Sequence, residues 1–295
     1  MYKQSFITNN VTNDDASVHY TVDLEDFSFD LCRSVGAYSD PKLRSESLYK
    51  SYLNIKELLS DQDDQGSKIT FFCTGVMADK YPNLIKMIAE DGHEIACHGN
   101  FHDDIFSMSP EEVYETLKVA KKKLSKISKN EIRGFRAPRF SIDKNDFERL
   151  DAISQVFDYD SSLHFSSNIQ FKEWAKGCPL KLHEFPVPAQ KVFSQKVKVK
   201  TGGSYLKLFP VSLVKYAIRK SIKNNITPII YLHPYDLVYD YEMLLKWSEL
   251  KGASSRVYWY FRQVQWAGMF NWSQKRKLSN LFTNFNSLGR LDRYL

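Results

Sequence analysis

Short apolar segments alternate along this chain with amphipathic segments that repeat with the period of a helix. The strand-like segments cover residues 19–27, 68–75, 93–99, 132–138, 157–162, 183–187 and 227–234. Helical stripes cover 45–60, 81–92, 109–127 and 211–223, and Ser109 followed by Pro110 is typical of a helix start. Repeated strand–helix units are typical of a mostly parallel sheet covered by helices. The alternation therefore predicts an α/β barrel-like fold.

The length of 295 residues suits one large domain, and we expect a single domain over 1–295 with its core at about 18–240. Residues 241–295 are expected to form a helical extension packed on that core. A net charge of +6 without a dense block of Lys and Arg disfavours a nucleic-acid partner. The first twenty residues are polar and no run reaches 18 apolar residues, which favours a cytoplasmic location without a transmembrane segment.

Three acidic residues, Asp23, Glu25 and Asp26, stand where the first strand-like segment ends. An acidic cluster is most often a solvated loop or a helix cap, but these acids emerge from a buried strand. Functional side chains of parallel sheets gather at the carboxyl ends of the strands. Strand alternation places Asp23 and Glu25 on one face, where one carboxylate could bind a metal and the other could act as a base.

Two histidines, His98 and His102, follow the strand at 93–99 with a spacing of four residues. This spacing brings two imidazoles to one metal if the segment turns helically, although such pairs also occur by chance. His93, on the strand itself, is expected to be a structural histidine that forms hydrogen bonds.

Arg136 and His233 also stand at the ends of predicted strands. A buried Arg136 beside a carboxylate would hold it ionised and oriented, whereas an exposed one would have no such role. His233 follows the apolar segment TPIIYL. It is either a core histidine or, at the mouth of a site, a general acid.

The ordered set of TVDLED, TFFCTG, GHEIACHGNFH, RAPRF, DYDSS and YLHP resembles the polysaccharide deacetylases of carbohydrate esterase family 4, the NodB-homology proteins. The resemblance covers about residues 20–235. EFPV and TGGSYLKLFP are similar to a subgroup found near exopolysaccharide synthesis loci. The resemblance implies a distorted (β/α) barrel of the NodB-homology type.

The same resemblance implies a divalent metal, commonly zinc, held by one carboxylate together with His98 and His102. Asp23 would be the general base, and Arg136 would orient it. Because the family pattern has two adjacent aspartates and this chain has Asp-Leu-Glu-Asp, the third ligand is either Glu25 or Asp26. Alternation along the strand favours Glu25.

The resemblance also implies groups that act on the substrate. His233 would protonate the leaving amine, the backbone N–H of Arg139 would stabilise the oxyanion, and Leu232 would line the pocket for the acyl methyl. Many relatives carry an Asp–Trp pair that tunes the acid histidine, but this chain reads SSLHF there, and Glu184 is the substitute that we consider. Tyr205, beside a predicted turn at residues 202–203, is a candidate for sugar contact.

The predicted activity is the metal-dependent removal of an N-acetyl group from an amino sugar in a polysaccharide or glycan precursor. A deformylase or cyclic-amide hydrolase of the same fold, or an inactive glycan-binding protein, are the alternatives. We also consider peripheral association with a glycan-assembly system through the aromatic residues Tyr258 to Phe261, Trp266 and Trp272. Helical core packing is the preferred interpretation for most of these aromatic residues.

Overall fold

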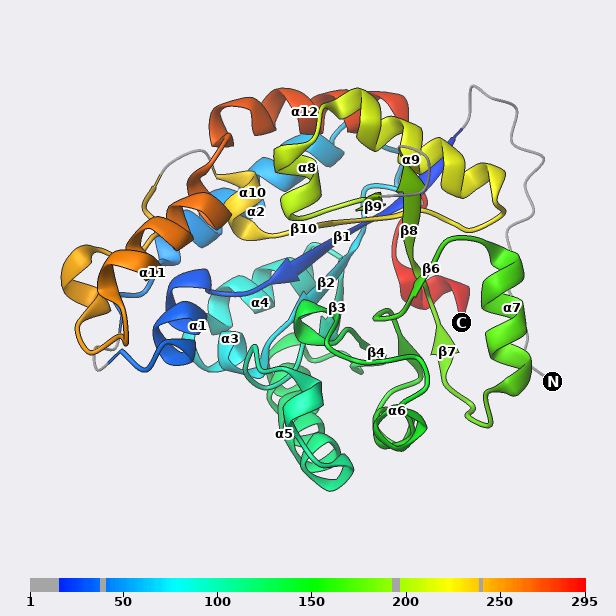
Figure 1. Cartoon of the computed structure of the whole chain (residues 1–295), viewed down its shortest axis with the longest axis horizontal. Helices are drawn as coiled ribbons and strands as arrows, with labels where there is room; N and C mark the ends of the chain where they lie inside the picture. Colours follow the sequence, from blue (N-terminus) through cyan, green and yellow to red (C-terminus); the bar gives the residue numbers. More distant parts are fainter. Residues whose placement is uncertain (1–15, 38–40, 193–196, 239–240) are drawn as a thin grey trace.

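A curled sheet of parallel strands forms the centre of the molecule (Figure 1). The computed structural model describes residues 16–37, 41–192, 197–238 and 241–295. The strand order is β10-β1-β2-β3-β4-β5-β7, and every neighbouring pair is parallel. The bounds are β1 Ser17–Leu24, β2 Thr70–Cys73, β3 Glu94–Cys97, β4 Gly134–Phe135, β5 Tyr159–Asp160, β7 His183–Glu184 and β10 Ile229–Leu232. This half-barrel with covering helices confirms the predicted α/β fold of the distorted (β/α) barrel type.

A smaller sheet lies beside the first and consists of β6 (His164–Phe165), β8 (Val187–Val192) and β9 (Val197–Lys200). The sequence predicted one strand over 183–187, but the structure divides this segment between β7 and β8, which belong to different sheets. Pro186 stands between the two strands. Proline has no N–H to donate to a ladder, and Pro186 stands where the chain passes from one sheet to the other.

The four predicted helices are confirmed as α2 (Ser45–Leu59), α4 (Pro82–Glu90), α5 (Pro110–Ser128) and α9 (Val211–Lys223). Ser109 caps α5 as predicted, since its side chain accepts from Glu112 N–H while the Glu112 carboxylate accepts from Ser109 N–H. The remaining α-helices are α1 (Phe27–Ser34), α3 (Gly75–Lys80), α6 (Phe147–Ser154), α7 (Asn168–Gly177), α8 (Ser204–Leu208), α10 (Pro234–Leu237), α11 (Arg256–Gln263) and α12 (Asn271–Asn284). In the described ranges, no helix has both the length and the apolar character needed to cross a membrane.

The C-terminal segment returns to the start of the sheet. Strand β11 (Asn286–Ser287) pairs in parallel with the first residues of β1, and Tyr20 donates a hydrogen bond to the Phe285 carbonyl at 3.1 Å. Helix α12 packs on α2, α8, α9 and α10. The extension predicted for 241–295 therefore supplies a strand as well as helices, and that strand was not predicted.

Helix α11 does not have the core position that we preferred for the aromatic segment. Tyr258 and Phe261 are exposed, whereas Trp259 and Trp266 pack against a small cluster formed by α1 and residues 245–267. A helix with aromatic residues on all sides can bury only one of its faces against a neighbour. The preferred interpretation is therefore wrong for Tyr258, Tyr260 and Phe261, which are all exposed, and the side chain of Trp272 lies outside the described residues.

Candidate active site

The residues selected from the sequence converge at the carboxyl ends of β1, β3, β4 and β10. There they surround a cavity of about 230 Å³. Because the strands are parallel, their ends meet at one edge of the sheet, where ligands bind in open α/β folds. The cavity is lined by Asp23, Glu25, Phe27, Asp30, Leu31, Ser34, His98, His102, Arg139, Phe140, Ser204, His233, Tyr235 and Trp266.

Glu25, His98 and His102 form a candidate metal site, because each offers a ligand atom and these atoms all lie within 4.8 Å of one another. Glu25 follows β1 directly, and His98 follows β3. Two imidazoles and a carboxylate are a donor set that suits zinc and other divalent transition metals. The geometry therefore brings together the three residues that the sequence suggested as ligands.

The environment of His98 favours its neutral form. Its Nδ1 lies 2.8 Å from the Arg136 carbonyl oxygen, which fixes Nδ1 as the donor and leaves the Nε2 lone pair for a ligand. Burial of the imidazole, which is 2% exposed, lowers its pKa to about 4. Since only a neutral imidazole can bind a metal, His98 has the required form at neutral pH.

Glu25 and His102 form a buried ion pair, with Oε2 and Nε2 2.7 Å apart. Burial alone would raise the pKa of the Glu25 carboxyl, but the neighbouring histidines, His102 first, outweigh burial and lower this pKa to about 2. Burial likewise lowers the pKa of His102, and the Glu25 charge more than offsets that effect, so the pKa is raised. A metal bound between these two atoms would replace the proton of His102, because a histidine ligand must be neutral.

Asp26, the rival ligand, has a different role. Its carboxylate accepts hydrogen bonds from the backbone N–H groups of Ser28 at 3.0 Å and Phe29 at 3.2 Å, and a third from the Tyr81 hydroxyl. Asp26 is therefore the N-cap of α1. The strand predicted to run to residue 27 ends at Leu24, because this cap starts a helix.

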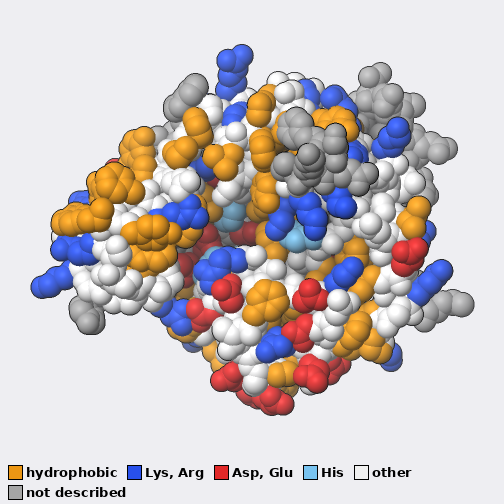
Figure 2. Space-filling view, in the orientation of Figure 1, with side chains coloured by type: hydrophobic (Ala, Val, Ile, Leu, Met, Phe, Trp, Pro, Cys, Tyr) orange, Lys and Arg blue, Asp and Glu red, His pale blue; other side chains and the backbone are white. Residues whose placement is uncertain are grey.

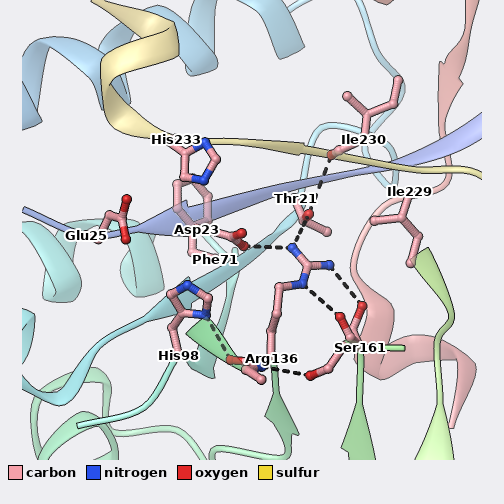
Figure 3. Close-up of polar contacts among 12 residues, drawn as sticks. Thr21, Asp23, Glu25, Phe71, His98, Arg136, Ser161, Ile229, Ile230 and His233 are labelled. Carbon is pink, nitrogen blue, oxygen red and sulfur yellow. Dashed lines mark hydrogen bonds and ion pairs between the residues drawn. The ribbon is translucent and has the colours of Figure 1, made fainter. Parts of the chain in front are cut away.

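Asp23 is held by Arg136, whose Nη1 lies 2.7 Å from Oδ1 (Figure 3). The guanidinium is fully buried and also donates to the Thr21 hydroxyl, the Ser161 carbonyl oxygen and the Ser161 hydroxyl, at 2.9, 3.0 and 2.9 Å. Its Cζ lies 4.0 Å from the centre of the Phe72 ring. These contacts leave the guanidinium one orientation, so the carboxylate is oriented as well.

Figure 3 shows Asp23 between this guanidinium on one side and the side chains of Glu25, His98 and His233 on the other. The Arg136 interaction is therefore on the side of Asp23 that faces away from the candidate metal site. That leaves the second side of the carboxylate directed toward the cavity, which Asp23 lines. A base in this position can reach a molecule in the cavity while Arg136 holds it.

His233 is paired with Asp236, a residue that the sequence did not suggest. Asp236 Oδ2 accepts from the backbone N–H of His233 at 2.9 Å and lies 3.0 Å from its Nδ1. Burial lowers the pKa of His233, but the hydrogen bond and charge of Asp236 outweigh it and raise the pKa to about 9. The imidazole is therefore protonated at neutral pH, as a general acid must be.

Lys207 stabilises this pair through its contact with Asp236. Its Nζ lies 3.5 Å from Asp236 Oδ1 and donates to the carbonyl oxygens of Trp266 and Ala267 at 3.3 and 2.9 Å. The side chains of Lys207 and Asp236 are 2% and 0% exposed. The interaction with Lys207 helps to lower the pKa of Asp236, which burial alone would raise. Asp236 thus remains a carboxylate beside His233.

Glu184, suggested as the partner of His233, is elsewhere. It accepts a hydrogen bond from the Leu163 N–H at 3.0 Å and pairs in register with Asp160. Its strand, β7, and the strand that carries His233, β10, stand at opposite ends of the sheet order. The suggestion was therefore wrong. The segment His-Pro-Tyr-Asp itself held the signal, since an acid three residues after a helix cap can reach back to the cap N–H.

Of the three residues proposed to contact substrate, Arg139 lines the cavity, whereas Leu232 and Tyr205 do not. Arg139 lines the cavity and forms an ion pair with Asp104 at 2.7 Å, on a turn where Arg139 and Phe140 both have positive φ, 54° and 56°. Leu232 is fully buried in the main core rather than on the cavity wall. Tyr205 packs against a side cluster and stacks on Phe209, and the neighbouring Ser204 lines the cavity instead.

The predicted turn at residues 202–203 is present and determines that arrangement. Gly203 has φ 52° and its N–H donates to the Tyr231 carbonyl at 3.2 Å. A Cβ on Gly202 would lie 2.1 Å from the same oxygen. The backbone of this turn therefore contacts β10 directly, and α8 starts at the cavity rim.

Asp30, on α1, is a further cavity residue that sequence reasoning missed. Both of its carboxylate oxygens are shielded from solvent, and among the described residues neither has a hydrogen-bond partner. Burial and the nearby carboxylates raise the pKa of Asp30 to about 8, although the charge of His102 acts in the opposite direction. The sequence did not indicate that Asp30 lies near the acids at the end of β1, because α1, the helix that carries it into the cavity wall, was not predicted.

Two sequence families match the chain. Residues 53–153 match the model described as polysaccharide deacetylase, and residues 166–286 match DUF3473, a domain of unknown function that occurs in deacetylases of exopolysaccharide loci. The two matches lie on either side of β5 and contribute strands to the same sheet.

The chain is also similar to individual proteins and solved structures. The peptidoglycan deacetylase-like protein FGM2 of Gibberella zeae is 29% identical over 121 residues, which are 40% of this chain and only 35% of that protein. A crystal structure from Mycobacterium smegmatis, described as a candidate polysaccharide deacetylase, has 17% identity and a TM-score of 0.50, over 94% of this chain and 95% of that chain. The peptidoglycan deacetylase PdaC of Bacillus subtilis has 11% identity and a TM-score of 0.46, over 96% and 92%. The polysaccharide deacetylase match, the DUF3473 match and the fold support assignment of the chain to the polysaccharide deacetylases of carbohydrate esterase family 4.

Proposed function

We propose that this protein is a metal-dependent hydrolase that removes the N-acetyl group from an amino sugar. The observation that carries the proposal is the grouping of Glu25, His98 and His102 within 4.8 Å, next to the Asp23 carboxylate and across from a protonated His233. Amide hydrolysis needs an activated water and an acid for the poor leaving group, and this cavity offers residues for both.

The residues of the candidate metal site fit a divalent cation, since their donor atoms are close together and an ion pair already joins two of them. When bound there, such a cation would lower the pKa of water and polarise the amide carbonyl. Asp23 is positioned to take the proton from the attacking water, while the ion pair with Arg136 keeps its carboxylate oriented. His233 is positioned to give a proton from Nε2 to the departing nitrogen, because Asp236 engages Nδ1.

The cavity suits one sugar unit with its acyl group, and its wall combines apolar and polar groups. Phe27, Leu31, Tyr235 and Trp266 supply apolar surface, and Ser204 supplies a hydroxyl. Apolar walls with a few convergent polar groups are typical of sites for small ligands. Release of formate, or opening of a cyclic amide, would need the same groups, so substrate trials must separate these reactions.

Metal analysis and product analysis of matched variants test this function. Wild-type protein should contain about one divalent metal and release acetate from N-acetylated oligosaccharides. His98→Ala should lose both the metal and the activity, because one of three protein ligands is gone. Asp23→Asn should keep the metal and lose 10²–10⁴-fold in kcat, the usual range for a general base. An active protein after His98→Ala, or formate as the only product, would contradict the proposal.

The cellular setting stays a prediction. We expect a glycan precursor inside the cell to be the substrate, in association with a glycan-assembly system. Fractionation of the host, together with rates on a small precursor and on finished polymer, tests this expectation. A protein found outside the cell and active only on long polymer would contradict it.

A further inference from the structure

Helix α11 and the preceding turn present apolar side chains to solvent. We call the side chains of Trp247, Val257, Tyr258, Tyr260 and Phe261 the aromatic face. Their exposed fractions are 47, 60, 54, 37 and 68%. Val257 and Phe261 are four residues apart on the helix, and Tyr258 and Phe261 are three apart, so they form one continuous surface. The Tyr260 ring contacts both Trp247 and Phe261, with centroids 5.7 and 5.8 Å away.

The aromatic face is the outer side of a helix that is already anchored on its inner side. Gln263 is the one buried residue of α11, and its amide bonds to the backbone N–H and carbonyl of Leu245 at 2.7 and 2.8 Å. Trp259 packs inward near Trp266. The exposed side chains therefore do not result from a poorly packed helix. A grouped apolar surface of this kind marks an interaction site.

Cations flank this aromatic face along the chain. The segment 241–270 contains the cations Lys246, Lys251, Arg256 and Arg262, against the two acids Glu242 and Glu249. Glu249 forms an ion pair with Arg44 at 2.8 Å, which reduces its effect on the neighbouring cations. The Arg256 guanidinium lies 4.5 Å from the Trp247 ring centre, so positive charge and aromatic surface are interleaved. The partner should therefore be apolar and negatively charged.

We propose that the aromatic face docks the protein on a membrane surface that carries anionic lipid headgroups. Trp, Tyr and Phe beside Lys and Arg are the side chains that settle at the boundary between headgroups and acyl chains. A second copy of this chain would bring the same four cations against one another in a two-fold contact. A neutral glycan would offer no charge to pair with them.

The aromatic face lies next to the candidate active site. Trp266 lines the cavity, and the Arg262 guanidinium, at the end of α11, lies 4.3 Å from its ring centre. Figure 2 shows histidine and acidic side chains at the floor of a hollow, with hydrophobic and basic side chains crowded at one side of it, over α11. Docking would place the cavity mouth beside the headgroups. If the proposed function holds, on which this step rests, the substrate class is a lipid-linked amino-sugar glycan.

Vesicle co-sedimentation of the full chain tests the docking. Vesicles of phosphatidylcholine with about 30% phosphatidylglycerol should bind the protein at low salt, and binding should weaken as salt screens the charges. Pure phosphatidylcholine vesicles should bind it at least about tenfold more weakly. Tyr258→Ser combined with Phe261→Ser should reduce binding to the anionic vesicles by about tenfold or more, because two apolar anchors are removed. Tyr216→Ser is the matched control, since Tyr216 is 53% exposed on α9 and should not affect binding.

The outcomes distinguish membrane docking from self-association and from glycan binding. Equal binding to both vesicle types, or to neither, would overturn the proposal. A dimer that light scattering detects in the wild type and not in the double variant would assign the face to a second copy instead. Binding of a lipid-free oligosaccharide that the double variant loses would assign it to glycan. The sedimentation assay does not depend on turnover, so a failure of the deacetylase proposal would be seen separately, in the acetate assay.

Discussion

Replacing Asp236 by Asn tests whether a buried carboxylate sets the protonation of the acid histidine. The change keeps the shape of the side chain and removes its charge. Burial lowers the pKa of His233, and Asp236 provides the largest opposing effect, which raises it to about 9. Without that charge, burial is opposed only by the smaller effects of Glu25 and Asp23, and the pKa should fall toward the ordinary 6.5.

The expected loss of rate follows from the two pKa values. A group that must be protonated supports activity below its pKa and loses it as the pH rises through that value. At pH 8 a pKa of about 9 leaves about 90% of His233 protonated, and a pKa of 6.5 leaves about 3%. We therefore expect about a 30-fold lower kcat/KM at pH 8 in Asp236→Asn. At pH 5.5 both proteins have mostly protonated His233, so the difference should nearly vanish.

The assay is the pH dependence of kcat/KM, combined with an NMR titration of the His233 ring. Because Asp236→Asn also removes the carboxylate that faces Lys207, the double variant Asp236→Asn with Lys207→Met serves as the control for an unpaired buried cation. His233→Ala gives the rate without any acid at this position. If the basic limb stays near pH 9 in Asp236→Asn while the fold is intact, Asp236 does not tune the histidine and the reasoning is refuted.

Three further variants test separate parts of the structure. Glu25→Ala should empty the metal site, whereas Asp26→Ala should keep the metal and cost about 1 kcal/mol of stability through the lost helix cap; elemental analysis and denaturant unfolding decide. Glu94→Gln should flatten the pH dependence of stability. Burial raises the pKa of Glu94 in the folded state from 4.5 to about 7, so the wild type should lose about 3 kcal/mol of folding stability as the pH rises through that range. Urea unfolding at several pH values measures this loss. If the variant loses the same stability over that pH range, the assignment to Glu94 is wrong. Gly202→Ala should lower the melting temperature and cost about 1–3 kcal/mol, because its Cβ would collide with the Tyr231 carbonyl; an unchanged melting curve would contradict the close approach.

Much of the fold could be predicted because the strand ends carry polar residues and the longer helices have clear periods. Helix α9 has the predicted bounds, and His93 is the structural histidine expected, since its Nδ1 accepts from the Ile69 N–H at 3.1 Å. The sheet groups Asp23, Glu25 and His98, whereas His102 reaches the site from the loop after β3. Parallel strands bring their ends together whatever the loops do, so residues at those ends could be identified without knowledge of the loops.

The residues that were missed depend on short helices that start directly after strands. Helix α1 places Asp30 and Phe27 on the cavity wall, and α10 turns Asp236 back onto His233. Helices of four to eight residues have too few turns for a periodic signal. Trp266 reaches the cavity through tertiary packing of a segment far along the chain, and no local pattern in the sequence could indicate that contact.

The pairing of β1 with β10 also determines when the central sheet can be completed during synthesis of the chain. Thr21 pairs with Tyr231, so the strand that carries Asp23 lacks this neighbour until about 210 more residues have been made. At about 5–20 residues per second, that wait on the ribosome lasts roughly 10–40 s. The nascent chain can bring His98 and the acids of β1 together long before His233 exists. Throughout that interval one side of β1 is an unpaired edge, which offers a template for pairing with another chain.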